Sequence, residues 1–549
     1  MSQTILTVAF DVQPAGAAPL EGTVTKFRQT VEGGCHTYDQ LGQAVPTLHF
    51  MSLMVFTDVQ FDPLFLLEVN FDGPRDAFWP SLVQAIGPDL RTMLGFCAPP
   101  RDRAQGKAFD HFVETGEGLA AVLDAAAITP TASHLGNRGL SRARIEAEGE
   151  LFAAVQKELG DDRAYRGLAP PAIHSKLRVA LLPANDWLSR PGPSRVTVDE
   201  SVADYRNLAV FACEAVTVLT LPGVLLAALV PAGLAAVLVL VAAMLIWWRI
   251  PDLHPSQPAV PKQVARPPRN RLLPARVFGR TAVGLIILVI AVIACVHVLS
   301  LALWLLNDIA AVTAGQPPPD LRAWLGRTFG MSLVGLLGLP AVLLGLVYSV
   351  RRLEGLDGAN CAARPDPTVM RQMQEREDQT SEVFQNHMGS IALVKAGGLR
   401  TLLLVLIHRA LHLYLRVNAR DGYLSDMRTI HFAHWALLGN RGRLLFMSNF
   451  DGTWDSYLDD FIEKAHAGTT LAWTNCIGSP LARFLLLDGV THGRQFKAWA
   501  RRSMTPNLFW FSAYPKLTVN QIERNHLVAE GLRCPTLDPT AATEWTRSL

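Results

Sequence analysis

Two stretches of the sequence carry an aspartate–glycine pair at the end of an apolar, strand-like segment. One is VNFDGPRDAF, which begins at Val69, and the other is SNFDGTWDSY, which begins at Ser448. A carboxylate at this place can act as an acid or base. It can also accept hydrogen bonds from free helix N–H groups while the glycine takes a special backbone conformation. An active site usually needs one copy, so the presence of both Asp72 and Asp451 favours the capping role.

His49 and His431 form a second matched pair, each as the second residue of an aliphatic segment. Strict strand alternation predicts that Leu48 and Phe50 share one face and that the histidine takes the other. A histidine on an inner face could serve as a ligand or an acid–base group, and the alternative is a hydrogen-bonded core histidine. His434 follows His431 by three residues and is expected to face the opposite way, which makes the two a poor chelating pair.

Two more sets of ionisable side chains have a spacing or surroundings that suit chemistry. His408 and His412 are four residues apart, a spacing that places two imidazoles on one helix face and suits a metal ion. No second cluster of histidines or carboxylates accompanies them, so we expect no metal site and predict that Leu399–Leu415 is a helix at the membrane surface. Glu214 and His297 are the ionisable side chains in or at the edge of long apolar runs, which makes them functional candidates.

The matched aspartates and histidines belong to a longer internal repeat. Residues 48–50 correspond to 430–432, residues 66–73 to 445–452, and residues 140–141 to 517–518. Small changes of offset in loops are typical of a diverged duplication. Each copy is predicted to form strand, strand, helix, strand, helix, strand, helix, with a short strand at 470–474. Because a small sheet with helices on one face must cover its other face, we expect two α+β modules packed sheet against sheet.

Three runs without Asp, Glu, Lys or Arg lie between the two copies, at residues 215–248, 281–306 and 328–350. Each run can cross about 30 Å of hydrocarbon at about 1.5 Å per residue. Residues 208–248 are long enough for either one crossing or two. The loop 249–280 carries seven Lys or Arg against one Asp, which predicts a cytoplasmic position. Packing of the two modules requires both on one side, so four crossings in two hairpins are favoured, with both modules in the cytoplasm.

The chain of 549 residues is therefore divided into four parts. These are a first ferredoxin-like module with an extension at 1–200, a transmembrane region at 201–355, a linker with an interfacial helix at 356–426, and a second ferredoxin-like module at 427–549. The net charge of +2 argues against nucleic acid as a partner. Scattered cysteines fit a reducing compartment, and no secretory signal is apparent, so we expect an integral protein of the inner (cytoplasmic) membrane.

Two ferredoxin-like modules packed through their sheets as an intramolecular α/β barrel resemble the dimeric α/β-barrel superfamily. That group includes the dye-decolourising peroxidases, the chlorite dismutases and small monooxygenases. Its peroxidases carry a Gly-x-x-Asp-Gly motif whose aspartate works on the distal side of heme. Asp451-Gly452 and Asp72-Gly73 match the last two positions, whereas Ser448 and Val69 stand where the motif has its first glycine.

The resemblance implies a membrane-anchored oxidoreductase that uses heme and acts on an apolar substrate from the bilayer. Its catalytic group would be Asp451, with Asp72 as the twin; His431 and His49 join them as acid–base candidates because of their positions in the strands. A histidine downstream of the aspartate would hold the heme, which makes His492 and His526 the cofactor-binding candidates. The alternative is a non-catalytic protein, anchored in the lipid bilayer, that binds a partner protein, a lipid or another apolar small molecule.

Overall fold

The structure is a computed structural model. It describes residues 3–549 apart from 33–34, 59–60, 161, 251–300, 303, 318–319, 358–366, 369, 372–383, 419–423 and 425–426. Most of the loop predicted at 249–280, most of the predicted span 281–306 with His297, and part of the predicted linker therefore lie outside the described residues.

Two five-stranded antiparallel sheets form the centre of the molecule. The first has the order β12-β2-β3-β1-β4, formed by β1 (Gln3–Asp11), β2 (Leu48–Asp58), β3 (Phe61–Asp72), β4 (Ala127–Ile128) and β12 (Phe509–Ser512). The second has the order β11-β6-β8-β7-β5, formed by β5 (Ala132–Leu135), β6 (Gln385–Leu393), β7 (Ile430–Leu438), β8 (Arg443–Asp451) and β11 (Met504–Thr505). Every residue from Leu64 to Asp72 is buried because both faces of the first sheet are covered.

Each sheet contains four strands from one half of the chain and one from the other half. β12 pairs with β2 of the first half, where Phe509 lies opposite Leu53. β5 pairs with β7 of the second half, where Ala132 lies opposite Trp435. The two sheets have the same strand order. β2, β3, β1 and β4 of the first half correspond to β7, β8, β6 and β11 of the second, and the exchanged strands β12 and β5 lie at equivalent edges. Because each sheet is completed by backbone hydrogen bonds to an edge strand from the other half, the two halves must lie on the same side of any bilayer.

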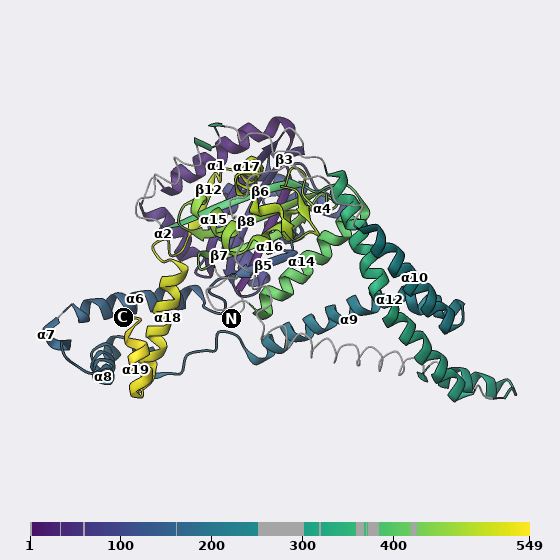
Figure 1. The fold of residues 1–549 in the computed structure, drawn as a ribbon. Coiled ribbons are helices and arrows are strands. Elements are labelled where there is room, and N and C mark those ends of the chain that lie inside the picture. The colour runs from purple at the N-terminus through teal and green to yellow at the C-terminus, as the bar shows by residue number, and fades with distance from the viewer. Residues whose placement is uncertain are drawn as a thin grey trace.

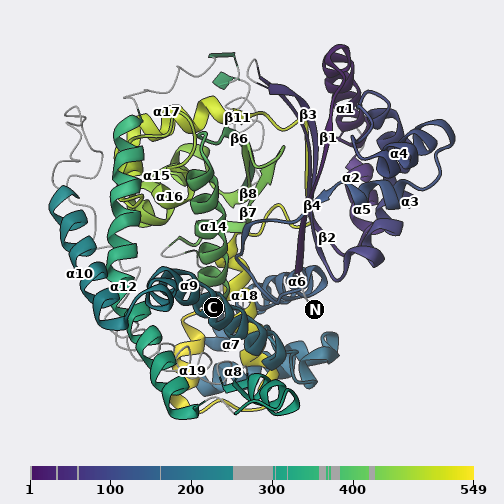
Figure 2. The same ribbon diagram turned by 90° about the vertical axis from the view of Figure 1, so that its right-hand side faces the viewer.

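Helices cover the outer face of each sheet, so that the body has four layers (Figure 2). The first sheet is covered by α1 (Ala17–Glu32), α2 (Cys35–Ala44), α3 (Arg75–Leu94), α4 (Arg103–Thr115) and α5 (Leu119–Ala125). The second is covered by α14 (Gly398–Asn418), α15 (Trp454–Lys464), α16 (His466–Trp473) and α17 (Gly493–Ser503). A separate helical lobe contains α6 (Arg142–Leu159), α7 (Asp162–Tyr165), α8 (Pro170–Leu181), α18 (Val519–Arg533) and α19 (Pro539–Thr546).

The inner faces of the two sheets are in contact. One apolar cluster joins Met54, Phe56 and Leu66 of the first sheet to Ile391 and Leu445 of the second. Separate clusters lie between each sheet and its own helices. Successive side chains of a strand point to opposite faces, so each strand contributes to both an outer and an inner core.

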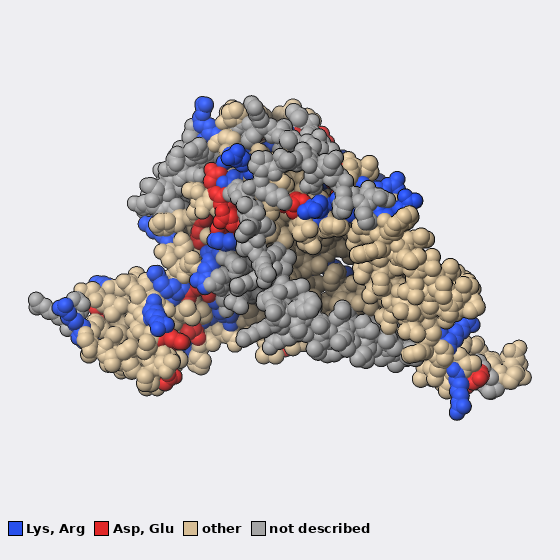
Figure 3. Space-filling model, viewed as in Figure 1, with Lys and Arg blue, Asp and Glu red and all other residues tan. Residues whose placement is uncertain are grey.

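Three long apolar helices project from the body: α9 (Val198–Leu229), α10 (Ala232–Arg249) and α12 (Leu321–Leu356) (Figure 1). Each is long and apolar enough to cross a membrane, as is Gly398–Val417 of α14. Val237, Met244 and Trp248 of α10 are more than half exposed, which is expected of side chains that face lipid. Charged side chains are sparse over this part of the surface and reappear at its far tip (Figure 3). The predictions of an α+β class and of helices suited to a membrane are confirmed.

The apolar run 208–248 forms two helices, with the break at Val230–Pro231. α9 packs against α12 through glycines, since a Cβ on Gly223 would lie 2.7 Å from the carbonyl oxygen of Val334. Small residues of this kind allow membrane helices to approach closely. At the other end of α9, Asp204 accepts hydrogen bonds from Arg138 at 2.7 Å and Arg416 at 3.2 Å, which fixes the helix to both halves.

Two segments differ from the sequence-based expectations. Residues 470–474, predicted as a strand, lie mainly in α16, because a short apolar run fits a buried helix as well as a strand. The range 356–426, predicted as a linker and interfacial helix, contributes β6 to the second sheet and α14 to its cover. α14 is apolar because Leu404 and Leu415 face the sheet-side core while Leu403 and Ile407 pack with Val350 of α12.

The exchanged strands predict that exposed sites in both halves react from the same side of the membrane. Cys534 in the second half is an exposed thiol, and Glu150 is an exposed position in the first half. A membrane-impermeant maleimide should label Cys534 and an introduced Glu150→Cys thiol in the same preparation, either spheroplasts or inverted vesicles. Cys534→Ser serves as the control for background labelling. Labelling of the two sites from opposite sides would contradict the strand exchange.

Candidate functional site

A β-bulge shapes the strand at each matched histidine. The pairing of β2 with β3 shifts between Leu48 and Phe50, and that of β7 with β8 shifts between Ile430 and Phe432. The extra residue in each strand is the histidine. A bulge reverses the alternation of side chains that follows it. Leu48 therefore belongs to the core on the helix side and Phe50 to the core between the sheets, so the expectation that they share a face was wrong.

Each bulged histidine is paired with the matched aspartate of its own half. His49 Nε2 lies 3.0 Å from Asp72 Oδ1, and His431 Nε2 lies 2.8 Å from Asp451 Oδ1. All four side chains are almost completely buried. The structure thus brings together the residues that were singled out as two matched pairs.

The second oxygen of each aspartate accepts a backbone N–H at the start of a distant helix. Asp72 Oδ2 lies 2.7 Å from the nitrogen of Arg142, the first residue of α6. Asp451 Oδ2 lies 2.8 Å from the nitrogen of Val519, the first residue of α18. A carboxylate is favourable at a helix N-terminus because the free N–H groups there carry partial positive charge. The strand before each of these helices, β5 or β12, belongs to the opposite sheet. Each aspartate therefore attaches the start of the following helix to the half of the chain to which that helix belongs.

The two histidines differ in their remaining contacts. His49 Nδ1 lies 2.8 Å from the hydroxyl of Tyr514, whereas the corresponding position in the other half is Asn137, whose amide donates to Glu523 at 2.7 Å. Burial raises the pKa of Tyr514 well above its ordinary value. An Asp72–His49–Tyr514 chain therefore occurs once in the described part of the molecule, with a phenol that stays protonated.

A buried glutamate lies at the centre of a polar cluster between the sheets. Glu68 of β3 has no exposed surface, and its Oε2 lies 2.8 Å from Nε2 of His387 on β6. His434 of β7 approaches the other oxygen at 3.6 Å. Three further donors surround the carboxylate: Ser52 at 3.2 Å, Asn70 at 3.2 Å and Asn449 at 3.4 Å.

The charge state of this cluster follows from its neighbours. Burial alone would raise the pKa of Glu68, but hydrogen bonding to His387 and the nearby imidazoles hold that pKa below its ordinary value. For His434 burial prevails over the attraction of Glu68, so its pKa is lowered. The arrangement can hold Glu68 as an ionised carboxylate beside His387, whose Nδ1 lies 3.4 Å from the half-buried Asn507.

This cluster was not predicted from the sequence. The repeat places Met447 at the position of Glu68, and Ile5 at that of His387, so a search for matched residues passes over both. Plain alternation predicts that His434 faces away from His431 and from the inner face, whereas the bulge returns His434 to the inner face. A single charged residue within the strand sequence LFLLEVNF was the available signal.

The histidines suggested for heme binding occupy separate places. His526 of α18 lies 3.1 Å from Glu148 of α6. The nearby Arg144 donates to Glu148 and Glu530, each at 2.8 Å. The atoms of Glu148, His526 and Glu530 are close enough to hold a metal ion, but the Arg144 guanidinium already supplies the positive charge there. His492 is buried at the start of α17, after the short helix η5 (Gly489–Thr491).

A peroxidase-like heme site requires an aspartate that is free to act on the distal side and a histidine available to the iron. Both oxygens of Asp451 are occupied, one by His431 and one by the start of α18. His526 is held in the ion-pair network with Glu148. Asp451 and His526 are therefore already engaged in the places where the resemblance would have them serve a heme.

The remaining candidates have structural partners. His408 Nδ1 lies 2.9 Å from the hydroxyl of Thr131, and its Nε2 lies 3.3 Å from the carbonyl oxygen of Ala472. His412 lies 3.5 Å from Ser133. Glu214 forms an ion pair with Arg409 of α14 at 2.7 Å. These contacts join α14 to β5, α16 and α9.

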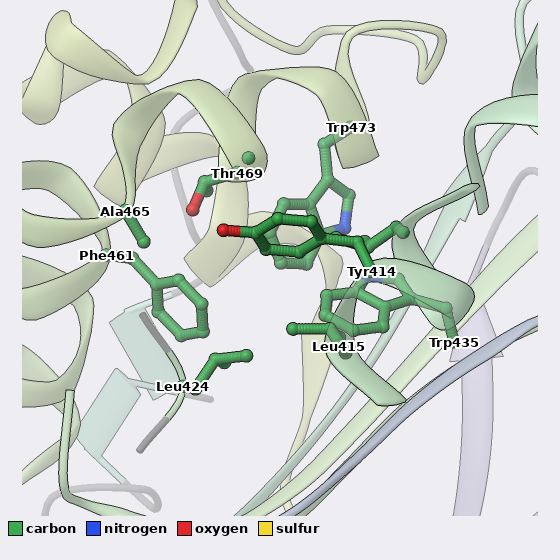
Figure 4. A pocket seen from close by; sticks show the side chains of 10 residues that line it. Tyr414, Leu415, Leu424, Trp435, Phe461, Ala465, Thr469 and Trp473 are labelled. Carbon is green, nitrogen blue, oxygen red and sulfur yellow. The ribbon is translucent and has the colours of Figure 1, made fainter. Parts of the chain in front are cut away.

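An apolar pocket opens between the second sheet and its helices (Figure 4). Its cavity volume is about 60 Å³, and it is lined by Leu411, Tyr414, Leu415, Leu424, Trp435, Phe461, Ala465, Gly468, Thr469 and Trp473. The Tyr414 ring lies across the pocket, and its hydroxyl points toward Thr469 (Figure 4). The repeat places Leu53, Leu82 and Leu94 where this pocket has Trp435, Phe461 and Trp473. At these three positions the second half therefore has aromatic side chains where the first half has leucines.

The matched aspartates should behave as helix caps. Replacing Asp72 or Asp451 with alanine should lower the free energy of unfolding by about 1–3 kcal/mol, because a helix start loses its acceptor and a buried histidine loses the carboxylate beside it. Asp72→Asn and Asp451→Asn should cost less, since asparagine keeps an acceptor oxygen. Denaturant unfolding of the four variants measures this. Equal losses for Asn and Ala at both sites would contradict the capping role.

Glu68 should make stability depend on acid pH. Its lowered pKa means that its contribution is fully present above the ordinary value of 4.5 and is lost as pH falls through the folded-state pKa. Glu68→Gln should flatten the acid side of a plot of melting temperature against pH. Glu150→Gln, at an exposed position, should leave the plot unchanged. An unaltered acid limb in Glu68→Gln would show that the carboxylate does not supply this dependence.

No family model, curated protein or solved structure matches this chain.

Proposed function

We propose that this is a membrane-anchored protein whose second half binds an apolar molecule in the aromatic pocket. The observation that supports the proposal is the pocket lining, in which indole, phenyl and aliphatic groups surround two hydroxyls (Figure 4). Binding sites for small molecules are typically concave and mostly apolar, with a few polar groups that orient the ligand. Apolar surface that leaves water contributes roughly 25 cal/mol per Å², so a hydrocarbon chain end is a suitable occupant.

The position of α14 supports delivery from the bilayer. Leu411, Tyr414 and Leu415 line the pocket from the C-terminal half of this helix. The same half is joined to α9 by Arg409–Glu214 and Arg416–Asp204. A molecule that partitions into the membrane would therefore meet the anchor helices next to its binding site.

Heme-dependent oxidation is not part of the proposal, because Asp451 and His526, which the resemblance assigned to a heme, are engaged in structural contacts. A duplicated ferredoxin-like barrel remains our proposal for the fold. It is supported by the order β1-α1-β2-β3-α3-β4 in the first half and by the matched strand order of the second.

We further propose four crossings with both halves in the cytoplasm. The strand exchange requires an even number of crossings between the halves, and the basic residues of 249–280 favour a cytoplasmic loop. In the maleimide experiment, both thiols should then react in inverted vesicles. Reaction of both in spheroplasts would reverse the orientation.

Filling the pocket should abolish binding. Gly468 lines the pocket, and a Cβ there meets no atom within 4 Å, so Gly468→Leu adds a side chain without a backbone clash. A fatty acid carrying a diazirine should crosslink to peptides that contain Tyr414 or Trp473 in the wild-type protein. Gly468→Leu should reduce this labelling at least about tenfold, which corresponds to about 1.4 kcal/mol of binding.

The control is Gly22→Leu in α1, a helical glycine whose added Cβ also meets nothing within 4 Å. It should leave the labelling of the pocket unchanged. Labelling of α10, which faces lipid, provides an internal reference for the probe. Wild-type pocket peptides that stay unlabelled, or labelling that persists in Gly468→Leu, would contradict the proposal.

A further inference from the structure

The last turns of the membrane helix α12 enter the second half through a buried ion pair. Arg351 is 1% exposed and Glu354 is 6% exposed, and their side chains are in contact. The Glu354 carboxylate accepts two backbone N–H groups, from Phe484 at 3.1 Å and from Leu485 at 2.8 Å. The Arg351 guanidinium lies 5.0 Å from the centre of the Phe484 ring. One carboxylate thus joins a helix suited to the membrane to one tight turn.

That turn has an unfavourable backbone for its residues. It connects β9 (Ala482–Arg483) to β10 (Leu487–Asp488) and is closed by a hydrogen bond from Leu486 N–H to Arg483 oxygen. Phe484 and Leu485 have φ angles of 55° and 62°. Consecutive left-handed residues of this kind are typical of a type I′ turn, which favours asparagine and glycine. Bulky side chains pay a conformational cost there, and the two hydrogen bonds to Glu354 offset it.

The hairpin contacts α16 on its other side. Immediately after β10, Val490 N–H donates to the Thr470 hydroxyl at 3.1 Å. A Cβ on Gly489 would lie 2.4 Å from Thr470 Cγ2, so the two segments touch closely. Thr470 is the neighbour of Thr469, which lines the pocket, and Trp473 lies one turn further along α16.

An apolar cluster joins the same elements. Val350 and Leu346 of α12 pack with Leu403 and Ile407 of α14, and the cluster also includes Leu471 of α16 and Leu485 of the turn. α14 and α16 present their other faces to the pocket. The end of α12 is therefore in contact with the turn, and it shares one apolar cluster with α14 and α16, the helices on the two sides of the pocket.

We infer that the end of α12 regulates the pocket through the Glu354-bound turn. With Glu354 in place, the turn stays left-handed and holds α16 against α14; when α12 shifts, the turn relaxes and α16 loses its support. This inference rests on the proposed binding function of the pocket. Coupling between two sites is reciprocal, so a ligand in the pocket should in turn strengthen the attachment of α12 to the turn.

The test uses the full-length protein in nanodiscs with two readouts. Hydrogen exchange of residues 482–490 and of α16 reports the turn and the helix without any ligand. Diazirine fatty acid labelling reports the pocket. Glu354→Ala should speed exchange in both segments and reduce pocket labelling about tenfold or more, whereas Arg352→Ala, at an exposed position in the same turn of α12, should change neither.

A rescue variant separates coupling from general damage. Phe484→Asn with Leu485→Gly supplies the residues that favour a type I′ turn, so adding both to Glu354→Ala should restore slow exchange and pocket labelling. Faster exchange with unchanged labelling would overturn the coupling while leaving the binding function intact. Unaltered exchange in Glu354→Ala, or a rescued turn without restored labelling, would also overturn it. A wild-type pocket that takes no label would instead overturn the binding function.

Discussion

The exchange of edge strands is the constraint on which the other features depend. β12 completes the first sheet beside β2, and β5 completes the second beside β7. These backbone ladders hold the two inner sheet faces together, bury Glu68 between them, and bring Tyr514 to His49. They also explain the matched aspartates. β5 and β12 each pair with the opposite sheet, and each is followed by a helix, α6 or α18. The carboxylate at the end of β3 binds the start of α6, and the carboxylate at the end of β8 binds the start of α18, so each helix stays attached to its own half.

The correspondence between the two halves distinguishes residues that have a counterpart of the same type from residues that do not. A His–Asp pair occurs in each half, with closest N···O distances of 3.0 Å and 2.8 Å. Glu68, with Met447 as its counterpart, and the aromatic pocket, with leucines as its counterpart, occur once. Buried polar clusters are costly unless every member is satisfied, and aromatic rings in place of leucines change the shape of a core. These positions are therefore the places where the chemistry of the two halves differs.

The sequence predicted much of the architecture because repeated motifs and long apolar runs are local signals. Asp72, Asp451, His49 and His431 were identified as matched pairs, and they lie together in the structure. The orientation around each histidine was mispredicted, since a bulge depends on pairing with a neighbouring strand and leaves no mark in alternation.

Other features depended on contacts that a single segment does not encode. α14 has the composition of a membrane helix, and its position between the second sheet and α12 explains the apolar side chains that it buries. The pocket draws its lining from three helices and a strand, and Glu68 meets His387 across two sheets. Neither arrangement can be derived from spacing along the chain.

The strand exchange also determines the order in which the molecule can be completed during synthesis. β2 is made early, but its edge partner β12 leaves the ribosome near the end of the chain, after α9, α10 and α12. Until then, Phe50–Leu53 has an unpaired backbone edge and the inner face of the first sheet has no cover, a state prone to incorrect pairing. The first half therefore cannot finish folding as an independent unit. Its last strand arrives only after the anchor helices have been made, so biogenesis of the soluble body is tied to insertion of its own anchor.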